Sequence, residues 1–64
     1  MDTFLSRLQN EQEELSLKIN KLEGFFETEN FIELSFANQH LLKQQAMAMH
    51  KYNDILRVRL ELLK

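Results

Sequence analysis

The apolar residues in the first 26 positions of this chain repeat at alternating steps of three and four. This spacing places them on one face of an α-helix and predicts a helix over residues 3–23. The predicted face consists of Leu5, Leu8, Gln12, Leu15, Ile19, Leu22 and Phe26, with Gln12 as its one polar member. Asp2 or Thr3 is expected to cap the start of this helix. Gly24 is the natural stop at its end, although a helix can also continue through a glycine.

A second amphipathic helix is predicted over residues 36–63, where pairs of apolar residues recur every seven positions. The pairs are Leu41/Leu42, Ala48/Met49, Ile55/Leu56 and Leu62/Leu63. Three polar residues lie on the centre line of the same face, also seven apart: Gln45, Tyr52 and Arg59. This face is wider than the seam between two helices requires, so it can contact two neighbours at once.

The segment between the two long helices, residues 24–38, is too apolar for a free linker. Thr28 is positioned to cap a short helix over residues 29–34, and Ser35 to cap the long helix that follows. Four of the five phenylalanines of the chain fall in this segment: Phe25, Phe26, Phe31 and Phe36. We expect them to be mostly buried, either over the open end of the helix pair or against a partner chain.

These elements predict an all-α fold for residues 1–64 as a single domain, an antiparallel helical hairpin with a short helical elbow. A chain of this size buries only about 60% of its unfolded surface, so a monomer is marginal without a disulfide or a metal. The sequence has no cysteine, and His40 and His50 lack the spacing of metal ligands. We therefore expect the hairpin to oligomerise into a helical bundle, at least a dimer. The expected interface residues are Leu8, Leu15, Leu22, Leu42, Met49, Leu56 and Leu63.

Charge and motifs exclude several classes of function. The net charge of −2 disfavours a general nucleic-acid-binding protein, which needs a basic excess. No apolar run approaches the roughly 18 residues of a membrane span, and the N-terminus lacks the basic and apolar regions of a signal peptide. No phosphate-binding loop, nucleophile elbow or metal-ligand motif is present. We therefore expect a cytoplasmic, non-enzymatic protein without a metal or other cofactor.

The polar line on the second helix has two interpretations. Polar groups in a buried seam can fix register and partner number, in which case Gln12 would face one of them. Alternatively, the line belongs to a pocket at a subunit junction, where an aromatic ring stacks on a base and cationic groups bind phosphates. The candidate ligand-binding residues are Gln45, Lys51, Tyr52, Arg57 and Arg59.

The sequence resembles a group of small helical-hairpin proteins from tailed phages, including crAss-like phages. The resemblance covers roughly residues 15–60. It rests on Lys21, Leu22, Phe25, Phe31, Leu34, Leu41, Leu42, Gln45, Ala48, Met49, Tyr52, Ile55, Leu56 and Arg59. More loosely, the shape is similar to the helical hairpin of phage sponge proteins that sequester cyclic nucleotides and block CBASS or Thoeris immunity. The ligand-binding residues of those sponges do not align with this sequence, so the second likeness is one of shape.

The resemblance implies a phage counter-defence protein that works by binding in the cytoplasm of the infected bacterium. The leading hypothesis is an oligomeric sponge that sequesters a nucleotide immune signal, such as a cyclic nucleotide. One alternative is a helical interaction protein that docks on and inhibits a host defence protein, such as a nuclease or a CRISPR component. Another is a structural coiled-coil adaptor.

Overall fold

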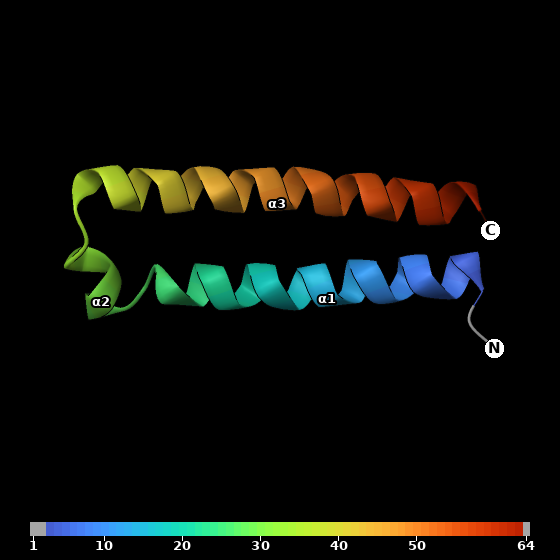
Figure 1. Cartoon of the computed structure of the whole chain (residues 1–64), viewed down its shortest axis with the longest axis horizontal. Helices are drawn as coiled ribbons and strands as arrows, with labels where there is room; N and C mark the ends of the chain where they lie inside the picture. The colour runs from blue at the N-terminus through green and yellow to red at the C-terminus, as the bar shows by residue number, and fades with distance from the viewer. Residues whose placement is uncertain (1–2, 64) are drawn as a thin grey trace.

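The computed structural model describes residues 3–63, which form three helices and two short connections. Helix α1 spans Phe4–Phe25, the short α2 spans Glu29–Ile32, and α3 spans Phe36–Leu62. The two long helices lie side by side and run in opposite directions, with α2 at one end (Figure 1). The molecule measures 45 × 19 × 13 Å. The predicted all-α helical hairpin is confirmed, whereas its oligomerisation stays a prediction.

Hydroxyl side chains cap the helices where the sequence indicated. The Thr3 hydroxyl oxygen accepts the backbone N–H of Ser6 at 3.0 Å and begins α1. The Ser35 hydroxyl oxygen accepts the N–H of Asn38 at 3.2 Å and begins α3. Each bond satisfies one of the N–H groups that a helix leaves free at its first turn.

The elbow is fastened by two polar side chains. Thr28 donates its hydroxyl hydrogen to the carbonyl of Phe25 at 2.7 Å, and the same oxygen caps α2. Gln39 in α3 donates to the carbonyls of Ile32 and Leu34, at 3.1 and 2.9 Å. These bonds satisfy carbonyls at and beyond the end of α2, which stops at Ile32, two residues before the predicted boundary.

Helix α1 continues through Gly24 and ends one residue later, so this glycine is not the stop that its position suggested. No glycine among the described residues has a positive φ, so the left-handed conformation that favours glycine is not used here. Apart from the adjoining residues and the nearby backbone of its own helix, a Cβ atom on Gly24 would meet nothing within 4 Å. The position therefore has room for a side chain and needs none of the conformational freedom of glycine.

We expect Gly24→Ala to stabilise the protein by about 0.5–1 kcal/mol, because alanine loses less backbone entropy in a helix. For a domain of this size, that change corresponds to a rise in melting temperature of about 2–8 °C. Thermal unfolding followed by circular dichroism measures it. A lowered melting temperature would mean that the glycine is required at this position.

The core lies along the seam between the two long helices. Leu8, Leu15 and Ile19 of α1 pack with Leu56 of α3, which is fully buried, and Met49 lies against this cluster. The α1 face is the one that the sequence predicted. The exposed member of this face is Leu5, which lies at the open end of the hairpin.

The seam on α3 is displaced from the predicted centre line by about a quarter of a turn. Its buried and half-buried residues also alternate by three and four. They are Gln39, Leu42, Ala46, Met49, Asn53, Leu56 and Leu60. Since the apolar face of α3 is wide, α1 covers only one side of it. Leu41, Ala48, Ile55 and Leu62, on the other side, remain exposed.

A polar layer interrupts the apolar seam. The Gln12 side-chain amide donates to Asn53 Oδ1 at 3.1 Å and to Ser16 Oγ at 3.0 Å. Asn53 is only 7% exposed, so this bond satisfies a buried polar group. The expectation that Gln12 would face the line of Gln45, Tyr52 and Arg59 is therefore wrong. The displacement of the seam brings Asn53 opposite Gln12 in their place.

The phenylalanines of the elbow are buried unequally. Phe31 is 6% exposed, and its ring centroid lies 6.0 Å from that of Phe25 and 4.9 Å from that of Phe26. Phe25 and Phe26 are half-buried. The expectation of burial is wrong for Phe36, which is 89% exposed, because the seam of α3 starts at Gln39 and leaves Phe36 on the outer side.

The residues expected at an oligomer interface lie mostly within the single hairpin. Leu8, Leu15 and Leu56 are buried between its own helices. The half-buried members are Leu22, Leu42 and Met49, while Leu63 is 47% exposed. The seam within one hairpin already buries or half-buries most of this set. Contact between chains through these residues stays a prediction.

Candidate functional site

Gln45, Tyr52 and Arg59 lie along one edge of the hairpin seam, which we call the tyrosine rim. The rim also includes Phe4 and Glu11, the residues of α1 that contact this line. The Tyr52 hydroxyl donates to the Glu11 carboxylate, and the Arg59 guanidinium carbon lies 5.9 Å from the centroid of the Phe4 ring. At the other end, Gln45 Nε2 lies 3.9 Å from the sulfur of Met49. Two of the three polar residues therefore bridge α3 to α1.

The two bridges show how positions of α1 pair with positions of α3, and this pairing follows a regular spacing in the sequence. The residue numbers of Tyr52 and Glu11 sum to 63, and so do those of Arg59 and Phe4. The same sum places Lys18 opposite Gln45. Phe4, Glu11 and Lys18 are seven residues apart, as are their counterparts on α3. This second heptad row, parallel to the core face of α1, is the signal from which the partners on α1 could have been predicted.

Arg59 lines two shallow hollows, one on the outer surface of α3 and one at the open end of the hairpin, between α3 and α1. One, of about 290 Å³, is also lined by Lys51, Asp54, Ile55 and Val58. The other, of about 200 Å³, is also lined by Phe4, Leu62 and Leu63. The rim thus places a guanidinium group between two largely apolar surfaces, with Tyr52 44% exposed on the same helix. A flat apolar group with attached phosphates matches this combination.

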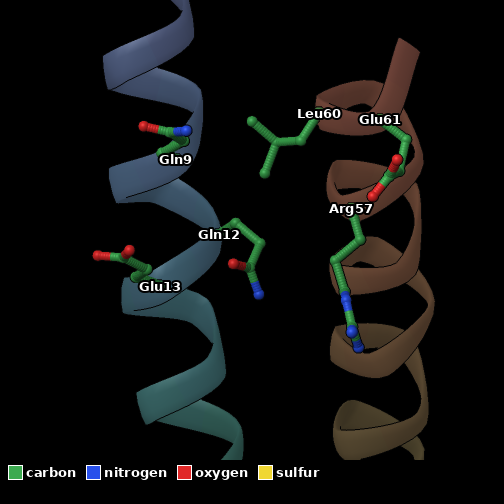
Figure 2. Close-up of a pocket in the computed structure, with 6 residues that line it drawn as sticks. All are labelled: Gln9, Gln12, Glu13, Arg57, Leu60 and Glu61. Atoms are coloured by element: carbon green, nitrogen blue, oxygen red, sulfur yellow. The ribbon is translucent and has the colours of Figure 1, made fainter. Parts of the chain in front are cut away.

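Arg57 lies on the opposite edge of the seam from Arg59, because residues two positions apart on a helix are separated by about 200°. It lines a hollow of about 340 Å³ together with Gln9, Gln12, Glu13, Leu60 and Glu61. Figure 2 shows Gln12 and Leu60 pointing into the space between the helices, whereas the Glu13 carboxylate is turned away from α3. Two carboxylates among the lining residues make this hollow a poor site for a polyphosphate.

The structure therefore separates the predicted ligand-binding residues into two groups. Gln45, Tyr52 and Arg59 share the tyrosine rim, and Lys51 lines the adjoining hollow. Arg57 lies across the seam, close to the edge where His50 Nε2 approaches the Glu23 carboxylate at 2.8 Å. The sequence pattern could not make this distinction, since it depends on which half of the wide α3 face α1 covers.

Two structural searches concern metals and membranes. Within residues 3–63, no group of three histidine, aspartate or glutamate side chains is arranged to hold a metal ion. None of the helices in this part of the chain is long and apolar enough to cross a membrane.

Comparisons with known proteins give two matches. A protein-family model described as Sequestin matches residues 2–62. An uncharacterized 7.5 kDa protein from the denB–rIIB intergenic region of Enterobacteria phage T4 is 34% identical over 64 residues, the full length of both chains. No solved structure matches the chain.

Proposed function

The chain belongs to the Sequestin family, and from this premise we propose that it is a phage counter-defence protein that sequesters a nucleotide immune signal. The observation on which the proposal rests is the match of this family model to nearly the whole chain, since the family's name denotes sequestering. Binding, and not catalysis, is the activity that such a name describes. The full-length similarity to a protein of phage T4 supports the phage setting.

The tyrosine rim is the proposed binding surface, and its chemistry suits a nucleotide. A base can stack on the exposed ring of Tyr52, with interactions that do not depend on base identity. Phosphates can accept hydrogen bonds from the planar guanidinium of Arg59 and the ammonium of Lys51. Gln45 supplies an amide that can both donate and accept.

The local charge of this face favours an anion although the whole chain is acidic. Arg7 is four residues from Glu11, and Lys18 is seven residues from it, so both lie on the same side of α1 as the Glu11–Tyr52 bond. Together with Lys51 and Arg59, they give four cationic groups on this face, against the carboxylates of Glu11, Glu14 and Asp54. A discrete anionic ligand can therefore bind here without general affinity for nucleic acid.

A thermal-shift screen of the purified protein tests the proposal. The probes are cyclic dinucleotides, cyclic trinucleotides and ADP-ribose derivatives, each added well above the protein concentration. A ligand that binds only the folded state at 100 times its Kd stabilises the protein by about 2.7 kcal/mol. At least one probe class is expected to raise the melting temperature, and a flat response to all three classes would contradict a nucleotide ligand.

Two arginine variants test where the ligand binds. We expect Arg59→Met to weaken binding of the probe found in the screen by about 10- to 100-fold, because a charge-assisted hydrogen bond worth about 1.5–3 kcal/mol is lost. Arg57→Met is the matched control, since it makes the same change on the opposite edge of the seam. Calorimetric titration of both variants measures the difference. Equal binding by the two variants would remove the tyrosine rim as the site.

One observation favours a second candidate function. At the elbow, Ile32 is 70% exposed, and Phe36, at 89%, is the most exposed large apolar side chain among the described residues. A helical inhibitor that docks on a host defence protein would use such a patch. Loss of phage protection in Ile32→Ser with Phe36→Ser, while Arg59→Met retains protection, would favour this alternative.

A further inference from the structure

We propose that two copies of the chain pair antiparallel through the outer side of α3, and that Tyr52 of both copies completes one ligand site at the two-fold axis. This inference deepens the proposed function and rests on it for the nature of the ligand. Its structural basis is a row of exposed apolar residues, which we call the outer row. The row consists of Leu41, Ala48, Ile55 and Leu62.

The outer row has the form of a second helix-packing face. Its first three residues each precede a seam residue by one position, so the row lies about 100° around α3 from the seam. Leu41 is 63% exposed, Ile55 49% and Leu62 80%. The near right angle between seam and row is the relation that a helix has to its two neighbours in a four-helix bundle. The hairpin supplies one neighbour, and the outer row lacks the other.

The charges of α3 favour antiparallel pairing with a second copy. Arg59 lies near the end of the helix, so parallel pairing would place it beside Arg59 of the partner subunit. Antiparallel pairing instead brings Arg59 toward the first half of the partner's α3, where Gln44 and Gln45 offer amide oxygens. It also sets the two helix dipoles in opposite directions. Antiparallel pairing therefore separates the two Arg59 side chains, which parallel pairing would bring together.

The side chains of the outer row complement one another in this orientation. When the full length of the row overlaps, Leu41 faces Leu62 of the partner subunit, and Ala48 faces Ile55 of the partner subunit. A small residue opposite a large one is the combination that lets two helices pack without a void. The same residues in parallel pairing would set Ala48 against its own copy and leave a gap beside it.

The two-fold axis then passes through the middle of the row. The midpoint between residues 41 and 62 is 51.5, which lies between Lys51 and Tyr52. Lys51 and Tyr52 lie about 100° apart around α3, on either side of the row, so the axis gathers the two phenol rings on one edge of the contact and the two ammonium groups on the other. A single copy offers one phenol ring, 44% exposed, so the site is incomplete without the second copy. A flat base can lie between the rings, and its phosphates can contact the guanidinium of Arg59, seven residues from Tyr52 on the same edge.

The contact between the two α3 helices is small, so we expect the ligand to contribute to the stability of the pair. The row is roughly 30 Å long and a helix is about 10–12 Å wide, so each copy covers only a few hundred Å². A standard stable interface covers about 800 Å² per partner. The pair is therefore weak by itself, and a ligand that contacts both copies strengthens it by mass action.

Tyr52 is the only tyrosine of the chain, which provides a direct test. Photo-oxidative crosslinking couples two tyrosine side chains, so any dityrosine-linked dimer must join Tyr52 to Tyr52 of another copy. We expect a crosslinked dimer with dityrosine fluorescence at tens of micromolar protein. Ile55→Glu and Ala48→Glu, which place a charge in the outer row, are expected to remove it. Leu17→Glu, at a 62% exposed position of α1, is the control that retains it.

Absence of the crosslinked dimer in the unmodified protein, or its persistence in both outer-row variants, would overturn the pairing. Circular dichroism of each variant establishes that it is folded. The probes of the thermal-shift screen then separate this inference from the proposed function. An equal shift for folded Ile55→Glu and the unmodified protein would remove the shared site and leave the proposed function. Crosslinking without a shift from any probe would leave the pairing and remove nucleotide binding.

Discussion

Replacement of Leu56 by alanine is expected to destabilise the hairpin by about 2–5 kcal/mol. The side chain is fully buried at the centre of the seam, so its removal loses both transfer free energy and packing contacts around the cavity that remains. A domain of this length is typically stable by only about 3–10 kcal/mol. The variant should therefore melt far below the parent, or be largely unfolded at 25 °C. Thermal and urea unfolding followed by circular dichroism measure the change.

Leu17→Ala is the matched control for this prediction. It makes the same chemical change at a position of α1 that is 62% exposed and away from the seam. Its effect should stay within about 0.5 kcal/mol, as is usual for surface positions. Similar losses at both positions would mean that the seam does not contain the core of the folded protein.

Phe31→Ala is expected to cost about 3–5 kcal/mol, because Phe31 is the buried aromatic residue around which the elbow is built. The substitution removes its ring contacts with Phe25 and Phe26. It also removes a cation–π contact from Lys43, whose Nζ lies 5.8 Å from the ring centroid. Differential scanning calorimetry should show a large fall in melting temperature.

Phe36→Ala provides the control within the same segment. Its ring is 89% exposed, so truncation should leave the melting temperature almost unchanged. The contrast between the two variants separates burial from residue type. An unchanged melting temperature for Phe31→Ala would show that the elbow is an exposed patch and not part of the fold.

The hairpin was predictable because its determinants are local. The face of α1 repeats at helical spacing over its whole length, and Thr3, Thr28 and Ser35 stand at the positions where helices need caps. A long α3 without proline or glycine has few alternatives to a continuous helix. Patterns of this kind act within a few residues and do not depend on tertiary contacts.

The choice of face on α3 was not predictable in the same way. Its apolar surface is wide enough for two neighbours, and nothing in α3 alone decides which half α1 covers. The decision rests on pairs across the seam, notably Gln12 with the buried Asn53. A polar partner for Gln12 was expected, but the wide face offered the wrong candidates. The small Ala46, 5% exposed, marks the half that α1 covers.

The same displacement changes the meaning of the polar line. Tyr52 and Arg59 are neither buried in the seam nor isolated in solvent, because each contacts a residue of α1 at its edge. A residue in such a position can both set the register of the two helices and bind a ligand. The contacts to α1 orient both side chains, and their exposed parts remain available.

Sequestration of an intact small molecule is the central claim, and a heat-release experiment tests it most directly. The purified protein is mixed with a filtered, protein-free extract of defence-active infected cells and removed by ultrafiltration, and the filtrate is assayed for its ability to activate the immune effector. The retained protein is then denatured at about 95 °C, and the released material is assayed in the same way. We predict that the activity disappears from the filtrate and returns after heating. Activity that stays in the filtrate, or that is lost and never returns, would contradict sequestration.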